Sequence, residues 1–491
     1  MQNDSFTTAP LRVLIIGAGF GGIGLAIQLQ KAGQGDFLIL EKAAEVGGTW
    51  RDNHYPGAAC DVPSHLYSYS FEPKADWSRK YAPQAEIHGY IRHCVDKYGL
   101  APRIRCNTEV SHAEFDEAQG LWQVHTRCGK TLHARSLVTA CGQLSRPAYP
   151  RIDGLEQFAG PAFHSAHWRH DVELKGKRIA VIGTGASAIQ FVPQIQPLAS
   201  QLSLFQRSAA YVIPKPDRPY RAWELALFRR LPFLQRLDRW RLYLQHEARA
   251  VAFTRVPALL QLFRGSFQRH LRRGVSDPAK RAQLQPDYPL GCKRILISND
   301  YFPALNQANV DIVGTPITAI EANGVRTADG RLHEADVLIY GTGFAATDFL
   351  APMQIRGLGG TELNAAWRSG AEAYKGISVS GFPNLFILYG PNTNLGHNSI
   401  IYMLESQFRY VLACLRVLDE QGLRYLDVKA PVQARYNQQL QAAEEHTIWA
   451  QGCTSWYLNA AGKNTVNWPG FTFTYRYLTR APELSDYVCT R

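Results

Sequence analysis

Residues 11–22 read LRVLIIGAGFGG, and this stretch decides the fold of the first part of the chain. Its apolar first half predicts a buried parallel strand, and the glycines that follow predict a tight turn that opens a helix. Gly17 permits the turn, Gly19 lets a pyrophosphate approach the backbone, and Gly22 allows the helix to pack closely on the strand. The stretch therefore predicts the start of a dinucleotide-binding βαβ unit.

The residues that follow complete this first unit. A helix is expected from about residue 22 to residue 32, and a second strand from residue 37 to residue 40. Glu41 ends that strand, where a carboxylate binds ribose hydroxyls and repels a 2′-phosphate, so FAD or NAD suits the site better than NADP. A merely structural glycine turn is the alternative, which Glu41 disfavours. The residues expected to bind this dinucleotide are Gly17, Gly19, Phe20, Gly21, Gly22, Glu41 and Lys42.

A second unit of the same kind begins at residue 178. Strands are expected at 178–182 and 203–205, with the GxGxxA variant of the glycine motif between them. Arg207 takes the place that Glu41 has in the first unit, and a guanidinium matches a phosphate, so this site is expected to prefer NADPH over NADH. The alternative is a surface arginine. The residues expected here are Gly183, Thr184, Gly185, Ala186, Ser187, Ala188, Arg207 and Ser208.

The distribution of charge excludes a uniformly basic nucleic-acid-binding protein. The 491-residue chain has a formal charge of +12, and residues 221–281 alone hold 13 arginines and one lysine against four acidic residues. The rest of the chain is therefore near neutral, which a nucleic-acid-binding surface would not be. Hydrophobic residues make up 46% of the chain and charged residues 19%, as in a folded globular protein of two or more domains.

Cysteine and histidine spacing argues against disulfide and metal chemistry. The nine cysteines are scattered and contain no C-x-x-C, so neither a disulfide framework nor a zinc site is expected, and a reduced, cytoplasmic protein is predicted. The 15 histidines show no metal-ligand spacing. The longest apolar run has 15 residues and five glycines, too short for a membrane-spanning helix.

One site that ends in a carboxylate and one that ends in an arginine suggest a bound flavin and a mobile NADPH. Two further segments narrow the class of flavoenzyme. A disulfide reductase needs two neighbouring cysteines after the first unit, and that region offers only Cys60. Residues 47–61 read GGTWRDNHYPGAACD, and residues 158–168 read FAGPAFHSAHW. Both segments resemble those of type I Baeyer–Villiger monooxygenases, as do GCKR at 291–294, the run 336–343 and GPN at 390–392. The second segment departs from the family fingerprint only at Arg169, where Pro or Asp is usual.

The resemblance implies a fold and a reaction. We expect an α/β protein with two Rossmann-like domains and a helical insertion in the second: an FAD-binding domain from 1–144 and 341–491, an NADP-binding domain from 152–208 and 290–340, and the insertion at 209–289. NADPH would reduce FAD, and reduced FAD and O2 would form a C4a-peroxyflavin that converts a small-molecule ketone to an ester or lactone. The alternative within the enzymes is an N- or S-oxygenating flavin monooxygenase, which Trp168 disfavours because such enzymes usually carry Tyr or Phe there.

The resemblance also assigns roles to single residues. Arg294 is the expected active-site arginine, which stabilises the anionic peroxide, and Asp61 is the carboxylate expected to hold it in place. Lys293 is expected on the 2′-phosphate beside Arg207. Flavin contacts are expected from Thr49, Trp50 and Tyr67, and a weaker adenine contact from the backbone of Val110. The alternatives are a structural ion pair, solvated side chains and core aromatics.

Two interpretations of a different kind remain open. His164 and Trp168 lie in the linker between the domains, and the histidine is expected to act through positioning, not as an acid or base. The basic segment 221–281 is expected to be a solvated helical face; attraction of NADPH and contact with an anionic membrane are less favoured.

A non-catalytic NADP(H)-binding or redox-sensing protein would have lost Arg294 or a flavin glycine, and neither is lost.

Overall fold

A mixed sheet built around the first glycine motif forms one half of the molecule. The structure, a computed structural model, describes residues 9–452, 455–459 and 461–491. In spatial order the strands are β17 (Gln354–Arg356), β4 (Val110–Asp116), β5 (Leu121–Thr126), β6 (Thr131–Thr139), β1 (Leu11–Ile16), β2 (Phe37–Leu40) and β3 (Ile104–Arg105), and β18 (Leu385–Ile387) also pairs with β6. β1 pairs in parallel with β2 and β6, and its apolar residues are buried on both faces, as a covered parallel strand requires.

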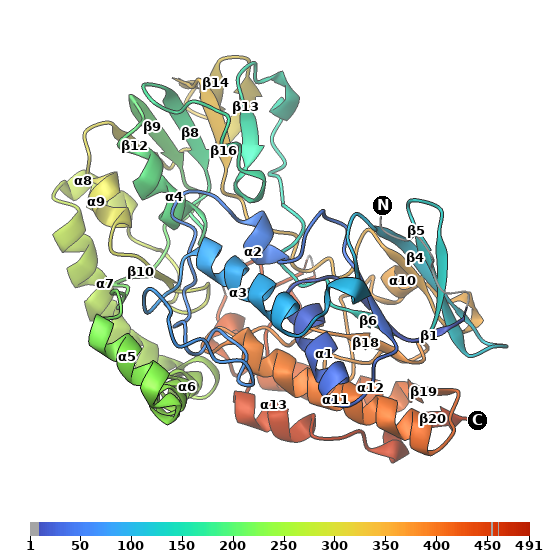
Figure 1. The fold of residues 1–491 in the computed structure, drawn as a ribbon. Coiled ribbons are helices and arrows are strands. Elements are labelled where there is room, and N and C mark those ends of the chain that lie inside the picture. The colour runs from blue at the N-terminus through green and yellow to red at the C-terminus, as the bar shows by residue number, and fades with distance from the viewer. Residues whose placement is uncertain (1–8, 453–454, 460) are drawn as a thin grey trace.

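Helices cover this sheet (Figure 1). α1 (Phe20–Lys31) contacts α3 (Gln84–Lys97) and α11 (Ile400–Glu420). α1 begins at Phe20, two residues earlier than the sequence indicated, with Gly19 as its N-cap. A Cβ on Gly24 would lie 2.6 Å from the ring of Phe408, so a glycine is needed for α1 and α11 to approach this closely.

A parallel sheet built around the second glycine motif forms the other half. Its strands in spatial order are β12 (Val310–Val313), β9 (Gln201–Phe205), β8 (Arg178–Ile182), β16 (Val337–Tyr340) and β7 (Ala162–His164). α4 (Ala188–Ile195) connects β8 to β9 as α1 connects β1 to β2. A small antiparallel sheet of β13 (Ile317–Glu321), β14 (Gly324–Thr327) and β15 (Leu332–Glu334) precedes β16, and α9 (Tyr301–Leu305) packs against α4.

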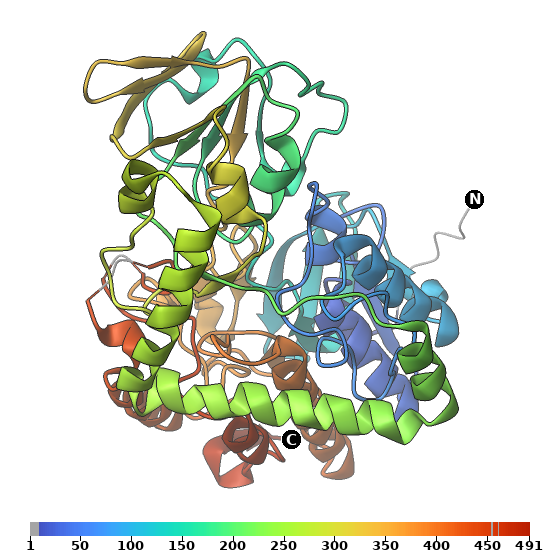
Figure 2. The ribbon, with the colours of Figure 1, turned by 90° about the vertical axis from the view of Figure 1, so that its left-hand side faces the viewer.

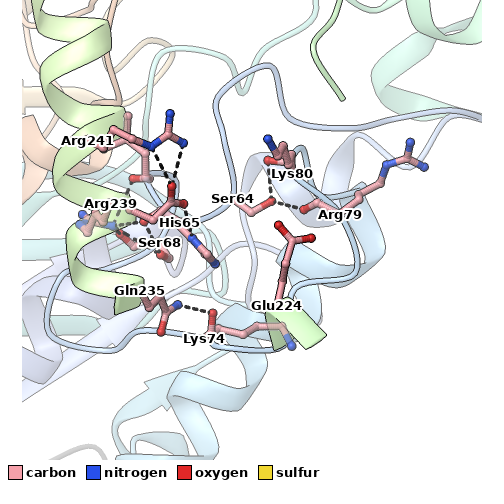
Figure 3. Close-up of polar contacts among 12 residues, drawn as sticks. Ser64, His65, Ser68, Lys74, Arg79, Lys80, Glu224, Gln235, Arg239 and Arg241 are labelled. Carbon is pink, nitrogen blue, oxygen red and sulfur yellow. Dashed lines mark hydrogen bonds and ion pairs between the residues drawn. The ribbon is translucent and has the colours of Figure 1, made fainter. Parts of the chain in front are cut away.

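Helices fill the segment between β10 (Val212–Ile213) and β11 (Leu296–Ile297), which pair with each other. They are α5 (Ala222–Arg230), α6 (Pro232–Thr254), α7 (Gln261–Gly274) and α8 (Pro278–Gln283). α6 runs along one side of the molecule, from α5 beside the first half toward α7 below the second half (Figure 2). Figure 3 shows how its inner side is held: the Gln235 amide donates to the carbonyl of Lys74 (2.6 Å), and the Arg239 guanidinium donates to that of His65 (2.6 Å).

The C-terminal part of the chain packs on the first half (Figure 1). It contains α12 (Ala430–Glu444), α13 (Thr472–Leu478) and the antiparallel pair β19 (Tyr425–Val428) and β20 (Tyr487–Thr490). Two further α-helices, α2 (Thr49–Asp52) and α10 (Leu363–Ala366), have four residues each. Within the described residues no helix is both long and apolar enough to cross a bilayer.

The predicted fold class is confirmed, since two sheets with Rossmann-like β-turn-α-β starts carry helices between β10 and β11. The predicted domain bounds stay a prediction. The first sheet takes β17 and β18 from far along the chain, as a discontinuous first domain would require.

Candidate active site

One cavity of about 1300 Å³ lies between the two halves and is lined by both glycine motifs. Of the residues predicted from sequence, the following line it: Gly17, Gly19, Phe20, Gly21, Glu41, Lys42, Thr49, Trp50, Asp61, Tyr67, Val110, Gly183, Thr184, Gly185, Ala186, Ser187, Arg207, Ser208, Lys293 and Arg294. Gly22 and Ala188 are also in the predicted set, but they lie behind the cavity wall and contact the protein interior. The motifs, 166 residues apart in sequence, therefore open onto one space.

The first glycine turn has the geometry that a bound pyrophosphate requires. Gly17 has a φ of +106°, and a Cβ there would lie 2.6 Å from the carbonyl oxygen of Ala140. A Cβ on Gly22 would lie 1.9 Å from the carbonyl oxygen of Gly17, so these two positions accept only glycine. A Cβ on Gly19 would meet nothing closer than 3.6 Å, which leaves the space above the helix N-terminus open to a phosphate.

The Glu41 carboxylate stands at the end of β2, beside this turn. It is 5% exposed, and its two oxygens accept hydrogen bonds from the backbone N–H groups of Ala18 (2.9 Å) and Ala43 (3.0 Å). Arg51 forms an ion pair with it at 3.1 Å. Burial opposes the charge of Arg51, but Glu41 and Asp52 together raise the pKa of its guanidinium. Arg51 lies inside the segment that resembles the family, yet only the structure indicates its partner.

The second glycine turn repeats the geometry of the first. Gly183 has a φ of +107°, and a Cβ there would lie 2.4 Å from the carbonyl oxygen of Gly341. The Gly183 N–H donates to the carbonyl of Phe205 (3.0 Å), as the Gly17 N–H donates to that of Leu40 (2.8 Å). Gly185 has no neighbour closer than 3.9 Å to a built Cβ, so this turn also leaves room for a phosphate group.

Two cations and a hydroxyl gather where β9 ends. The Lys293 ammonium donates to the Ser208 hydroxyl (3.0 Å) and lies 4.3 Å from the centroid of the Tyr288 ring. Burial and then the charge of Arg207 lower the pKa of Lys293. Two like charges held this close fit an anion with more than one negative charge.

The Arg294 guanidinium and the Asp61 carboxylate form the central ion pair of the cavity. Their closest atoms, Nη2 and Oδ2, are 2.5 Å apart, and about a third of each side chain is exposed (32% and 29%). The charge of Asp61 raises the pKa of Arg294, and burial opposes this effect only in part. The pair therefore presents a permanent, oriented cation to the cavity.

Residues that the sequence did not single out surround this pair. Tyr389 has a φ of +59°, lines the cavity and donates to the Oδ1 atom of Asn394 (2.6 Å). Burial raises the pKa of Tyr389 and of Tyr457, and the charge of Arg294 lowers both, which places the two phenols near the guanidinium. Asn394 follows the GPN motif at 390–392, but nothing in the sequence indicated its contact with Tyr389.

Aromatic side chains form the wall beside α2. The Trp50 indole N–H donates to the Tyr67 hydroxyl (3.2 Å), and the Phe20 ring lies 5.5 Å from the Tyr67 ring, edge to face. Thr49 begins α2, and Val110 begins β4 at the cavity lining. A wall of packed aromatic rings fits a planar ring system better than a solvated ligand.

Gln190 of α4 lines the cavity and joins the two halves there. Its Oε1 accepts a hydrogen bond from the Tyr55 hydroxyl (2.9 Å), and its amide donates to the carbonyl of Ala59 (2.9 Å). Both partners belong to the segment that carries Asp61, so Gln190 ties the second glycine unit to the loop of that carboxylate. A glutamine on a helix carries no sequence signal for such a contact, and the sequence missed it.

Cys292 and His164 were also considered from sequence. Cys292, next to Lys293 and Arg294, is disulfide-bonded. The expectation of reduced cysteines is therefore wrong at this position, because the spacing of cysteines in the sequence does not show which of them meet in the fold. His164 is fully buried, its Nδ1 accepts from the Ala166 N–H (3.1 Å), and burial lowers its pKa to about 4. No metal-binding cluster occurs in the part of the chain that the structure describes.

A cavity between two glycine-turn nucleotide folds defines the class of two-dinucleotide oxidoreductases. The family described as "Pyridine nucleotide-disulphide oxidoreductase" matches residues 14–221. A Baeyer–Villiger monooxygenase of Pseudomonas aeruginosa is 49% identical over 481 residues, which is 98% of this chain and 91% of that protein. The chain belongs to the Baeyer–Villiger monooxygenase family, as the sequence motifs predicted.

Solved structures agree with this assignment. A steroid monooxygenase bound to NADP matches with a TM-score of 0.87 and 31% identity, over 99% of this chain and 100% of that one. OTEMO in complex with FAD and NADP matches with a TM-score of 0.88 and 27% identity, over 98% of this chain and 100% of that one.

Proposed function

We propose that this protein is an FAD-dependent monooxygenase that uses NADPH and O2 to convert ketones to esters or lactones. The observation that carries the proposal is the Arg294–Asp61 ion pair, which lies in one cavity with both glycine turns. When bound, the flavin would supply the electrons, taken from NADPH, that activate O2, and O2 would supply the oxygen atom that is inserted.

The cavity residues divide into two groups that would hold the two nucleotides. The first glycine turn and Glu41 would hold the FAD pyrophosphate and ribose, with Thr49, Trp50 and Tyr67 along the ring and Val110 near the adenine. The second turn would hold the NADP pyrophosphate. Arg207, Ser208 and Lys293 would bind the 2′-phosphate, which neutralises the repulsion between the two cations.

Arg294 is assigned to the stabilisation of negative charge in the cavity. A guanidinium held in place before the reaction needs no reorganisation when charge develops, and one such donor contributes about 3–4 kcal/mol in well-studied enzymes. Asp61 accepts a hydrogen bond from one terminal nitrogen of the guanidinium. Because the guanidinium is planar, this contact also fixes the directions of its other N–H groups. Gln190 keeps the loop of Asp61 in register with the second glycine unit.

Oxygenation of amines or sulfides is not favoured as the main activity. Those reactions take an electrophilic, protonated oxidant, and a permanent cation in the cavity favours a deprotonated one. The relatives reported above carry the name Baeyer–Villiger monooxygenase, which agrees with this choice. The predicted cytoplasmic location stays a prediction.

The test is the reaction itself. We expect the purified protein to be yellow and to consume NADPH and O2 faster in the presence of linear, cyclic or aryl ketones. The product should be heavier than the ketone by one oxygen atom. A matched panel of tertiary amines and sulfides should be turned over more slowly. A colourless protein that takes up no flavin on reconstitution contradicts the proposal, as does a product that is an N-oxide or sulfoxide alone.

A further inference from the structure

A line of large apolar side chains runs along the outside of α6. Phe233, Leu237, Trp240 and Leu244 are spaced by four, three and four residues, so they share one side of the helix. Their exposed fractions are 59%, 63%, 61% and 60%, and Trp223 of the neighbouring α5 is 60% exposed. These five residues are called the outer face. Large contiguous apolar surfaces of this kind mark interaction sites in folded proteins.

The opposite side of α6 is fixed to the first half of the molecule, so the outer face cannot turn inward. Gln235 and Arg239 donate to backbone carbonyls of the loop at residues 65–74 (Figure 3). The Asp238 carboxylate also contacts the His65 ring at 2.8 Å. In Figure 2 α6 lies in front, with no other element over it. The exposure of the outer face is therefore part of the fold.

Arginines border the outer face, and the acidic groups nearby are already paired. Arg230 and Arg236 are exposed beside it, and the exposed Arg229 forms an ion pair with Asp76 at 3.9 Å. Asp238 is bound by His65 and Arg241, and the Glu224 carboxylate receives both terminal nitrogens of Arg218 at 2.6 Å. The border of the face is thus cationic. The two tryptophans and the arginines together have the composition of helices that lie in the interface of an anionic bilayer.

We propose that the outer face of α5 and α6 docks this protein on an anionic membrane surface. Leucine and phenylalanine would enter the boundary between headgroups and acyl chains, and the arginines would contact lipid phosphates. A symmetric pair of chains is disfavoured, because the same face on both copies would set arginines against arginines. The proposal is independent of the reaction proposed above, since the face lies outside the cavity lining.

The test is co-sedimentation of the intact flavoprotein with vesicles. Vesicles of phosphatidylcholine with about 40% phosphatidylglycerol should bind the protein, vesicles of phosphatidylcholine alone should bind it far less, and added salt should release it. The double variant Leu237→Gln/Leu244→Gln should weaken binding by roughly tenfold or more, because it removes two of the apolar side chains that would enter the bilayer. Leu198→Gln, at an exposed leucine of the second half, is the matched control and should bind like wild type.

Charge is tested in the same assay. Arg230→Gln/Arg236→Gln should bind less and lose much of the salt dependence, whereas Arg272→Gln/Arg273→Gln on α7 removes the same charge and should have little effect. NADPH oxidation by each variant serves as the check of folding. The proposal is overturned if the protein binds neither kind of vesicle. It is also overturned if Leu237→Gln/Leu244→Gln binds the anionic vesicles as strongly as wild type. A concentration-dependent dimer that Leu237→Gln/Leu244→Gln abolishes, without vesicle binding, would assign the face to a second copy instead.

Discussion

The Arg294 guanidinium lies 2.5 Å from the Asp61 carboxylate, although 233 positions separate the two residues in the chain. Asp61 follows α2 in the first half, and Arg294 precedes β11 at the base of the second. The contact therefore closes the cavity across the two halves. It also makes the position of the cation depend on how the two halves are arranged, and the hydrogen bonds of Gln190 to Tyr55 and Ala59 join the same two halves.

The first prediction concerns Arg294. Arg294→Ala should leave flavin reduction by NADPH measurable but lower ester formation by at least about 100-fold, the effect of removing one preorganised donor. Rapid-mixing absorbance of the flavin and product analysis by mass separate the two steps. Arg294→Lys keeps the charge without the planar fork and should recover only part of the rate. If Arg294→Ala still forms ester at the wild-type rate, Arg294 has no role in oxygen insertion.

The second prediction concerns Asp61. Asp61→Ala should lower ester formation by roughly tenfold to 100-fold, because removal of one partner of a partly buried pair frees the guanidinium from its orientation. Flavin content should stay near wild type. Asp171→Ala removes a carboxylate that pairs with Arg169 on the exposed surface, and this control should show normal rates. Equal rates in Asp61→Ala and Asp171→Ala would contradict the positioning role.

The third prediction concerns cofactor choice. Arg207→Ala should raise the KM for NADPH by roughly tenfold to 100-fold, the effect of losing hydrogen bonds to a charged group. The KM for NADH should change little, because NADH lacks the 2′-phosphate. Steady-state oxidation of both nucleotides measures the ratio, with the exposed arginine variant Arg331→Ala as the control. A parallel increase for both nucleotides would show that Arg207 does not contact the 2′-phosphate.

The fold was predictable where the signal is local. The glycine turns with their flanking strands indicated both β-turn-α-β starts, and β1, β2 and β8 begin and end where the sequence indicated. The sequence could not place β17 or β18, which pair with strands of the first sheet more than 200 residues away. It also did not indicate the antiparallel pairing of β4 and β5. These pairings depend on long-range packing, which periodicity within a short window does not report.

The candidate site shows the same division. Residues inside motifs, such as Asp61 and Arg294, were found, because a motif fixes residue type and spacing together. Tyr389 and Gln190 were missed, because each reaches the cavity from a segment whose own pattern indicates only a loop or a helix. The roles of the motif residues stay predictions until the variants above are measured.

The last prediction is a pH dependence that originates outside the cavity. Glu444 at the end of α12 is 4% exposed, and burial raises its pKa to about 8. The folded protein therefore binds a proton there that the unfolded chain, with an ordinary carboxyl pKa, releases as the pH rises. The contribution of this proton to the free energy of unfolding is then fully present below the ordinary carboxyl pKa and falls as the pH rises toward 8. The loss is on the order of a few kcal/mol. Glu444→Gln keeps an oxygen for the Asn464 amide (2.9 Å) and cannot ionise, so chemical unfolding should show it more stable than wild type at pH 8 but not at pH 4.5. The exposed neighbour variant Glu445→Gln should follow wild type, and identical pH profiles for all three proteins would show that Glu444 ionises as freely in the fold as in the open chain.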